Sequence, residues 1–445
     1  MDTSTGATTI PTQLLENRRP VERTILVGAP HRRVAARIVD EHMEELRQLT
    51  LTAGGEISGT LVQRLESPNR HTYIGAGKVR ELARLVEAAE AELVIFDEEL
   101  KPGQAKNLET ALGVRVMDRS ELILDIFASR ARTREAKIQV ELAQLEYLLP
   151  RLARMWTHLS RIRGGIGLRG PGETQIETDR RLIGQRIAEL RKKLARVAEA
   201  RQTQRRRRRG QYRAALVGYT NAGKSSVLRA LSGDDLPVED RLFATLDPAT
   251  RNVGLGGGYK ALVTDTVGFI RKLPHHLVAS FRSTLEEARE ADLLVHVVDV
   301  SHPEWAEQQG VVDEVLSGLD LAGRPQLLLF NKVDRITHAE EAGVRSRMIA
   351  LGEPPCVFGS AIQPAGLKPL KDALRARVRA CRPRVTLEIP PGEGALLARV
   401  HREGEVLEQQ DNGMSIRLTV RLPEPLVGRL RREPLVRMTG HREGA

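Results

Sequence analysis

The chain has 445 residues, a length that predicts about two to four domains, and its 41% of hydrophobic and 29% of charged residues predict folded cores. Aromatic residues make up only 3%, which disfavours folds that stack bases on aromatic platforms, and two cysteines exclude a disulfide framework. The net charge is +11, yet residues 130–209 alone carry 22 basic against 8 acidic residues, so one segment holds more than the whole excess.

The N-terminal part predicts a tail followed by an α/β domain. Residues 1–20 are polar and Thr-rich and are expected to form a disordered tail. From 21 to 130, short apolar runs alternate with helical periodicity, which indicates a mostly parallel sheet covered by helices. The predicted strands are Thr24–Gly28, Leu61–Leu65, Leu93–Asp97 and Val114–Asp118, and the predicted helices are Ala35–Leu49 and Lys78–Glu90.

Residues 131–210 lack strand patterns and predict a basic helical hairpin. Helical spacing covers Glu135–Leu149 and Ile176–Arg209, and a glycine-rich loop at 161–172 joins the two helices. Because Lys and Arg bind phosphates whatever the base sequence, the hairpin is a candidate RNA-binding arm. The alternative is a solvated pair of basic helices.

The remaining chain predicts a second α/β domain at 211–382 and a small unit at 383–445. The strands expected in the α/β domain are Ala214–Val217, Lys260–Thr264, Leu293–Asp299, Gln326–Asn331 and Cys356–Gly359. The small unit is expected to contain strands at Arg384–Ile389, Ala395–Val400, Glu405–Gln410 and Ser415–Leu422, and a helix at Leu426–Arg432.

The run GYTNAGKS matches the phosphate-loop pattern G-x-x-x-x-G-K-[ST] between a predicted strand and a predicted helix. In this context Lys224 reaches the β- and γ-phosphates and Ser225 offers its hydroxyl to Mg²⁺. Asn221 is also a candidate ligand for K⁺, with a turn-stabilising role as the alternative. The predicted nucleotide contacts of this motif are Gly218, Tyr219, Thr220, Asn221, Ala222, Gly223, Lys224 and Ser225.

A similar run, Gly75–Lys78, differs from this pattern. Thr72 stands where the first glycine belongs and Val79 where Ser or Thr belongs, so we interpret the run as a turn before a helix.

Two further segments are expected to respond to the nucleotide. The motif D-x-x-G follows the next predicted strand; its carboxylate can hold Mg²⁺ through water, and its glycine N–H can contact the γ-phosphate. These site residues are Asp265, Thr266, Val267 and Gly268. Between the motifs, a mobile threonine must close over Mg²⁺, and Thr245 is favoured over Thr250. The segment around it adds the predicted contacts Phe243, Ala244, Thr245, Leu246 and Asp247.

We expect Lys224, Thr245 and Gly268 to act in catalysis. No glutamine follows Gly268 to orient the attacking water, because Phe269 stands there. Intrinsic hydrolysis is therefore expected to be slow and to be completed by a partner.

The run NKVD ends a predicted strand and is expected to recognise the nucleotide base. Asp334 can accept the N1–H and the 2-amino hydrogens of guanine, donors that adenine lacks, so GTP is favoured over ATP. Asn331 is expected to brace the loop and the stem of Lys332 to cover the base. The predicted contacts at this end of the site are Asn331, Lys332, Val333, Asp334, Ser360, Ala361 and Ile362.

Together these segments resemble the HflX GTPases. The matching runs are GYTNAGKSS, FATLDPATR, DTVGFIRKLPHHLVASFRSTLEEAREADLLVHVVDVS, NKVD, YIGAGKVREL and GGIGLRGPGETQIETDRR. The resemblance implies the fold class α/β, with an N-terminal two-layer α/β domain and long helical hairpin, a central P-loop GTPase domain with a mixed, mostly parallel sheet, and a small C-terminal α+β domain. It also implies Ser225 and Thr245 as Mg²⁺ ligands. The chain departs from the family at Ile362, where members tend to carry a Thr-Gly pair.

The resemblance further implies a GTPase that binds the 50S ribosomal subunit and dissociates stalled or idle ribosomes, with the hairpin loop directed towards the peptidyl-transferase region. We expect a monomer in the cytoplasm, since neither a signal peptide nor an apolar run of membrane-spanning length is found; peripheral membrane contact is left open. One alternative is an RNA-binding scaffold or chaperone whose docking is regulated by guanine nucleotide. Another is a tRNA-modification GTPase, although no folate or metal ligands of a second catalytic domain are found. No motif supports an adenine nucleotide site in residues 21–130.

Overall fold

A computed structural model of the chain describes residues 22–152, 172–206, 210–234, 241–272, 287–352 and 354–439. The predicted tail at 1–20, nearly all of the predicted loop at 161–172 and residues 207–209 of the basic run lie outside the described residues. The chain forms two compact units, Met1–Arg119 and Ser120–Ala445. None of the helices in the described part of the chain combines the length and apolar character that a membrane crossing needs.

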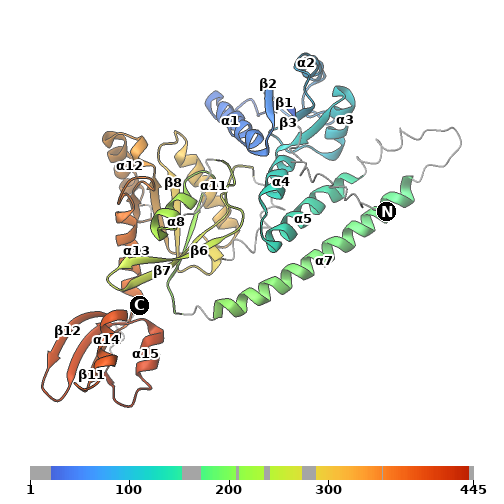
Figure 1. Cartoon of the computed structure of the whole chain (residues 1–445). Helices are drawn as coiled ribbons and strands as arrows, with labels where there is room; N and C mark the ends of the chain where they lie inside the picture. Colours follow the sequence, from blue (N-terminus) through green and yellow to red (C-terminus); the bar gives the residue numbers. More distant parts are fainter. Residues whose placement is uncertain are drawn as a thin grey trace, which may run out of the picture. The chain divides into compact units, whose positions relative to one another are not determined.

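The first unit is built on a parallel sheet with the strand order β2-β1-β3-β4 (Figure 1). Its elements are β1 (Arg23–Gly28), α1 (Ala36–Ala53), β2 (Glu56–Val62), α2 (Ala76–Ala88), β3 (Leu93–Phe96), α3 (Pro102–Leu112) and β4 (Arg115–Asp118). The apolar run of β3 is buried throughout, as expected for a strand covered on both faces. The predicted strand Leu61–Leu65 is wrong in its bounds, because pairing with β1 begins at Glu56 and ends at Val62, and the strand includes the half-buried polar residue Ser58.

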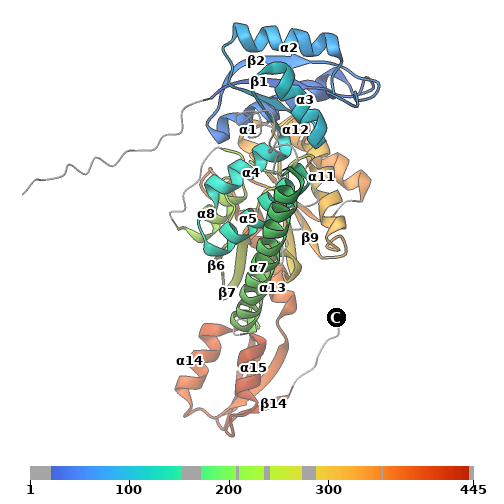
Figure 2. The ribbon, with the colours of Figure 1, turned by 90° about the vertical axis from the view of Figure 1, so that its right-hand side faces the viewer.

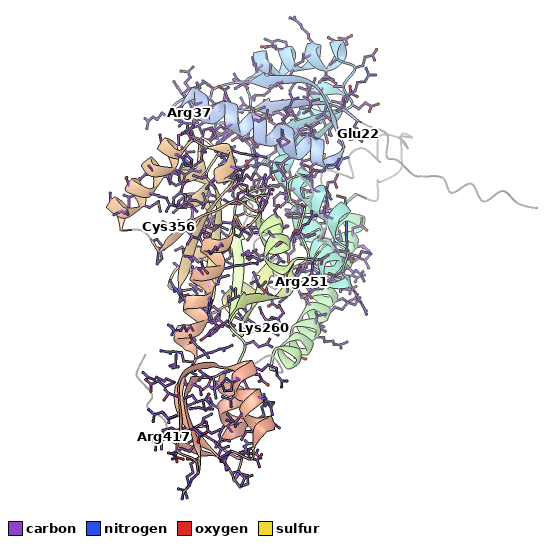
Figure 3. The ribbon with its side chains drawn as sticks, turned by 60° about the vertical axis from the view of Figure 1, so that its left-hand side comes forward. Glu22, Arg37, Arg251, Lys260, Cys356 and Arg417 are labelled. Carbon is purple, nitrogen blue, oxygen red and sulfur yellow. The ribbon has the colours of Figure 1, made fainter. Side chains whose placement is uncertain are left out.

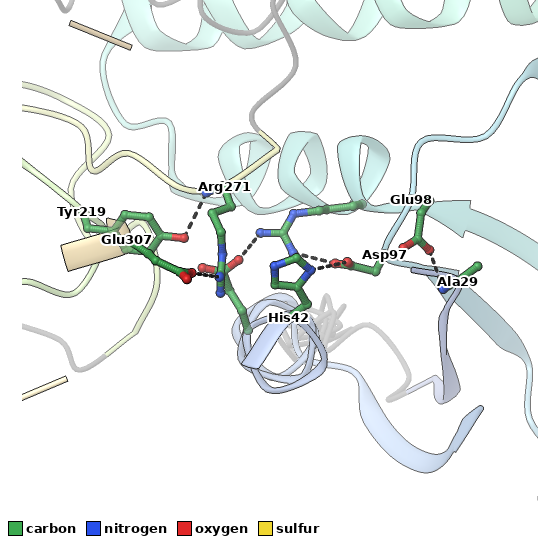
Figure 4. A network of polar contacts seen from close by, with 9 residues as sticks. Ala29, His42, Asp97, Glu98, Tyr219, Arg271 and Glu307 are labelled. Carbon is green, nitrogen blue, oxygen red and sulfur yellow. Dashed lines mark hydrogen bonds and ion pairs between the residues drawn. The ribbon is translucent and has the colours of Figure 1, made fainter. Parts of the chain in front are cut away.

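Buried charges in the first unit are held by one another. Arg119 pairs with Asp97 at 2.8 Å and also with Glu45, and His42 Nδ1 lies 3.8 Å from the second oxygen of Asp97 (Figure 4). The carboxylate of Glu98 accepts a hydrogen bond of 2.8 Å from the N–H of Ala29. Since a buried charge is costly unless it is paired, these contacts fix the loops that follow β1 and β3.

The second unit begins with helices. They are α4 (Arg119–Arg130, its first residue in the first unit), α5 (Arg134–Leu148), the short η1 (Leu149–Arg151) and α7 (Gly172–Arg206). Figure 2 shows α7 running beside α5. The two are joined by an apolar seam and by ion pairs of 2.7 Å (Arg186–Glu141) and 2.8 Å (Arg191–Glu146). The seam consists of Ile138, Leu142, Ile187 and Leu190. The predicted helical pair is thus confirmed over its described residues.

A six-stranded sheet follows, with the strand order β10-β9-β8-β5-β7-β6; only its edge strand β6 is antiparallel to its neighbour. Its strands are β5 (Arg213–Gly218), β6 (Ala249–Gly256), β7 (Tyr259–Asp265), β8 (Leu293–Asp299), β9 (Gln326–Asn331) and β10 (Cys356–Phe358). Its helices are α8 (Lys224–Ser232), α11 (Trp305–Gly318), η2 (Val333–Arg335), α12 (His338–Leu351) and α13 (Lys368–Cys381). The mixed, mostly parallel sheet agrees with the expected class, and β6 was missed because its sequence, ATRNVGLG, lacks a continuous apolar run. Arg251 and Lys260 mark the β6–β7 ribbon in Figure 3.

The C-terminal part is an antiparallel sheet with the order β12-β13-β11-β14 and two helices. Its elements are β11 (Arg384–Ile389), α14 (Gly394–Glu403), β12 (Glu405–Asp411), β13 (Ile416–Arg421), α15 (Glu424–Leu430) and β14 (Arg437–Thr439). Arg417, labelled in Figure 3, pairs across the strands with Glu388 at 2.7 Å.

The predicted strand Ala395–Val400 is wrong, because these residues lie in α14. Leu396, Leu397 and Val400 have the spacing of one helical face, and that face packs on the apolar core of this sheet. The five-part division of the chain at 20, 130, 210 and 382 stays a prediction.

The apolar seam of the arm gives a stability test. Leu190 is 1% exposed, and Leu182 on the same helix is 54% exposed. Leu190→Ala should destabilise the pairing of α5 with α7 by about 2 kcal/mol, because it removes buried apolar atoms and leaves a cavity. Hydrogen exchange of α7 should become faster in this variant and remain unchanged in Leu182→Ala. Equal exchange rates in the two variants would show that the seam does not hold the arm together.

Candidate nucleotide-binding site

The phosphate-loop motif lies between β5 and α8, at the carboxyl edge of the six-stranded sheet. Gly218 has a φ of 149°, and a Cβ there would lie 2.3 Å from the carbonyl oxygen of Val297 in β8. Gly223 has a φ of 95°, and a Cβ there would lie 2.3 Å from Nδ2 of Asn331 after β9. Both positions therefore require glycine, and its absence of a side chain lets three strand ends approach one another.

Lys224 is the buried cation of the loop. It is 6% exposed, and its Nζ donates to the carbonyl oxygens of Gly218 at 3.1 Å and Tyr219 at 2.8 Å. Burial lowers the pKa of Lys224 to about 8, although the carboxylate of Asp265 acts in the opposite direction. An ammonium held this way can gain stabilisation from a phosphate placed against the loop.

Three oxygen-bearing side chains meet beside the lysine. Ser225 Oγ donates to Asp265 Oδ2 at 2.7 Å and lies 2.7 Å from Thr245 Oγ1. Burial raises the pKa of Asp265, while Lys224 and the hydroxyl of Ser225 lower it. The other carboxylate oxygen, Oδ1, is buried and has no hydrogen-bond partner among the described residues. An unpaired carboxylate oxygen beside two hydroxyls is a hard, oxygen-only donor set, which fits Mg²⁺.

The D-x-x-G segment closes against the phosphate loop. A Cβ on Gly268 would lie 2.7 Å from Cα of Thr220 and 3.0 Å from Lys224 Nζ, so only glycine fits there. Phe269 exchanges backbone hydrogen bonds with the loop: its N–H donates to Gly218 at 3.1 Å and its carbonyl accepts from Thr220 at 2.7 Å. Because the Phe269 side chain is 2% exposed, it lies in the core and offers no group to an attacking water.

The segment after Phe269 is anchored to the same loop. The hydroxyl of Tyr219 accepts a hydrogen bond of 3.0 Å from the N–H of Arg271, whose guanidinium lies 3.9 Å from Glu307. Both contacts are drawn in Figure 4. The turn after D-x-x-G is therefore tied to the phosphate loop by both backbone and side-chain contacts.

The NKVD segment braces the loop from the far side. Asn331 Nδ2 donates to the carbonyl of Ala222 at 2.9 Å, and its Oδ1 accepts from the N–H of Ala361 at 3.1 Å. Lys332 Nζ lies 2.7 Å from Asp299 and donates to the carbonyl of Asn221 at 3.0 Å. One asparagine thus joins the phosphate loop to the segment after β10; the sequence predicted a bracing role for Asn331 but not its contact with Ala361.

A cavity of about 290 Å³ lies between these segments. The predicted residues that line it are Thr220, Asn221, Gly223, Lys224, Ser225, Phe243, Ala244, Thr245, Thr266, Gly268, Asn331, Lys332, Asp334, Ser360, Ala361 and Ile362. The other predicted residues lie outside its lining: Gly218, Tyr219, Ala222, Leu246, Asp247, Asp265, Val267 and Val333. Among these, the carboxylate of Asp247 is hydrogen-bonded to the start of α5.

Three further residues line the cavity that the motifs did not single out: Ser226, Arg241 and Arg335. Ser226 and Arg335 directly follow the motif residues Ser225 and Asp334, so their adjacency was a usable signal. Arg241 lies two residues before Phe243, and no spacing rule distinguishes it from other arginines.

Comparisons with known proteins agree with this geometry. Family models match residues 40–128 (GTP-binding GTPase, N-terminal), 130–208 (GTP-binding GTPase, middle region) and 213–332 (50S ribosome-binding GTPase). The chain is 44% identical over 423 residues to the GTPase HflX of Magnetococcus marinus, an alignment that covers 94% of this chain and 97% of that protein. It is 45% identical over 395 residues to the GTPase HflX of Alkalihalophilus pseudofirmus, covering 88% and 91% of the two chains.

Among solved structures, a GTP-binding protein from the archaeon Sulfolobus solfataricus in complex with GDP aligns at 26% identity with a TM-score of 0.43, covering 80% of this chain and 98% of that one. The site described above, with its phosphate loop, D-x-x-G and NKVD segments around one cavity, defines a P-loop GTPase. With the sequence similarity extending over most of its length, the chain belongs to the HflX family of GTPases.

The depressed pKa of Lys224 predicts a pH dependence of nucleotide affinity. Phosphate binds the protonated ammonium, so above a pKa of about 8 the protein must take up a proton when GTP binds. The affinity for GTP should therefore fall as the pH rises above 8, approaching about tenfold per pH unit. Titration with a fluorescent GTP analogue measures this. Lys224→Ala is the control, since it retains only the weaker effect of deprotonating guanine itself, and equal slopes in the two proteins would contradict the assignment.

Proposed function

We propose that this GTPase binds the 50S ribosomal subunit and dissociates or rescues stalled or idle ribosomes. The observation that carries the proposal is the match of residues 213–332 to the family model described as a 50S ribosome-binding GTPase. The basic arm supports it, because ribosomal RNA offers a dense array of phosphates. Such a factor acts in the cytoplasm, where ribosomes are, and we propose that it acts as a monomer.

The arm presents its charge to solvent. Basic residues along α7 are exposed, among them Arg180, Arg181, Arg191, Lys192, Lys193 and Arg196. Phosphate contacts by such side chains release counterions, so binding that depends on them weakens steeply as salt rises. A sequence-independent affinity of this kind suits an arm that enters a folded RNA.

Mg²⁺, when bound, would neutralise charge on the β- and γ-phosphates. Ser225 and Thr245 would hold the ion, and Asp265 would hold it through water with the carboxylate oxygen that has no hydrogen-bond partner among the described residues. Lys224 moves its ammonium from loop carbonyls to the phosphates, and the Gly268 N–H binds the γ-phosphate. Asp334 accepts the N1–H and 2-amino hydrogens of guanine, which sets the preference for GTP over ATP.

Hydrolysis is proposed to be slow until a partner completes the site. Phe269 is buried in the core, so the position next to Gly268 offers no side chain to orient water. A group supplied by a partner to such a site can raise the rate by about 10³–10⁵. The ribosome is the proposed source of that group.

The proposal is tested by measuring GTP and ATP hydrolysis with and without purified 50S subunits at fixed salt. GTP turnover should rise by more than about tenfold with 50S, ATP turnover should stay at background, and Lys224→Ala should abolish both the basal and the stimulated rate. Repeating the assay in K⁺ and Na⁺ buffers tests the proposed K⁺ site at Asn221, which equal rates would exclude. If 50S subunits do not stimulate turnover, the partner is another molecule.

The arm is tested in the same assay. Replacing Lys192 and Lys193 by Ala should weaken the stimulation of GTP turnover and reduce its dependence on salt. Replacing the two lysines by Arg preserves the charge and should preserve the stimulation and its salt dependence.

If Lys224→Ala still separates ribosomal subunits at the full rate, the protein is a nucleotide-regulated RNA-binding scaffold instead.

A further inference from the structure

The segment that carries Thr245 contacts α4 on one side of that threonine and the start of α5 on the other. Two residues before it, the ring of Phe243 lies edge-on to Phe127 of α4, with the ring centroids 4.7 Å apart. Two residues after it, the carboxylate of Asp247 reaches the start of α5. These two contacts flank the hydroxyl that lies 2.7 Å from Ser225 Oγ.

Asp247 caps α5 from outside the helix. Its Oδ2 accepts hydrogen bonds from the backbone N–H groups of Arg132 at 3.1 Å and Thr133 at 3.2 Å, and its Oδ1 accepts one from the hydroxyl of Thr133. Thr133 is the N-cap of α5, and its hydroxyl in turn accepts from the N–H of Ala136 at 3.1 Å. A carboxylate at this end of a helix also interacts favourably with the helix dipole, so hydrogen bonding and charge both stabilise the contact.

Phe243 joins the same helical segment to the phosphate loop. Its N–H donates to Thr220 Oγ1 at 3.0 Å, and its side chain is 2% exposed. Its φ of 55° is unusual for a residue with a large side chain, so the surrounding contacts must hold this backbone conformation. The contact with Phe127 is one of them.

The chain between Thr245 and the cap is too short to absorb movement. Leu246 alone separates Thr245 from Asp247, and two residues span at most about 7 Å. Leu246 is itself 3% exposed and so is fixed in the core. A shift of α5 by a few ångströms must therefore either break the cap or withdraw Thr245 from Ser225.

We propose that Asp247 is a positioning residue for GTP hydrolysis, whose cap on α5 holds Thr245 at Ser225 and makes the start of α5 a part of the nucleotide switch. Because coupling between two equilibria is reciprocal, a triphosphate that holds Thr245 stabilises the cap to the same degree that the cap favours the triphosphate. The inference depends on the GTPase activity and not on the ribosomal role. An experiment can therefore overturn this inference without overturning the proposed binding to the 50S subunit, and the reverse.

The test compares Asp247→Ala with the unchanged protein in binding and turnover. The affinity for a non-hydrolysable GTP analogue with Mg²⁺ and the intrinsic GTPase rate should each fall by about three- to tenfold, the range expected for a lost helix cap. The affinity for GDP should change by less than about twofold, because GDP offers no γ-phosphate for the Thr245 segment to close over. Asp320→Ala, which alters an aspartate that is 96% exposed, is the matched control and should leave all three values unchanged.

Variants of Thr133, which Asp247 contacts, show whether a loss in Asp247→Ala comes from this contact. Thr133→Ala should reproduce the selective loss of GTP-analogue affinity and of intrinsic GTPase rate. The double variant should lose no more than either single variant. Thr133→Ser should keep the original values, because it retains the hydroxyl. Asp247→Asn guards against misfolding of the Ala variant and should give an intermediate loss, since one accepting oxygen remains. Equal losses of GTP-analogue and GDP affinity, additive losses in the double variant, or unchanged values in Asp247→Ala would each overturn the proposal.

Discussion

The hydroxyl of Ser225 joins the three segments that must act together on a nucleotide. Hydrogen-bond distances of 2.7 Å link it to Asp265 at the end of β7 and to Thr245 in the loop before β6. Parallel strands bring their carboxyl ends to one edge of the sheet, and the two loop glycines allow these ends to approach closely. The phosphate loop, both responsive segments and, through Asp247, the first turn of α5 are therefore connected through one small cluster.

The electrostatics of the cluster favour a charged ligand. Burial depresses the pKa of Lys224 and raises that of Asp265, because the charged form of each group is less well solvated in the protein than in water. A triphosphate next to Lys224 and a divalent cation next to Asp265 would relieve both penalties at once. Relief of this desolvation penalty would therefore contribute to the free energy of nucleotide binding.

The sequence alone predicted the motifs in which binding a nucleotide requires particular residues at a fixed spacing. The phosphate loop and NKVD could be placed because glycine, lysine and carboxylate are needed at fixed positions next to strand ends. The helix at Ala395–Val400 was mistaken for a strand, because a six-residue apolar segment fits both periods until its packing partner is known. The cap by Asp247 could not be predicted, since its partner Thr133 lies 114 residues earlier and neither residue is unusual in its own segment.

The coupling of the nucleotide site to the arm is the central claim, and hydrogen exchange tests it most directly. The full chain would be compared with bound Mg²⁺ and GDP and with bound Mg²⁺ and a non-hydrolysable GTP analogue. The account predicts that the triphosphate slows exchange both in residues 243–247 and in the first turn of α5, including the amides of Arg132 and Thr133 that Asp247 binds. Slower exchange in residues 243–247 with no change at the start of α5 would contradict it.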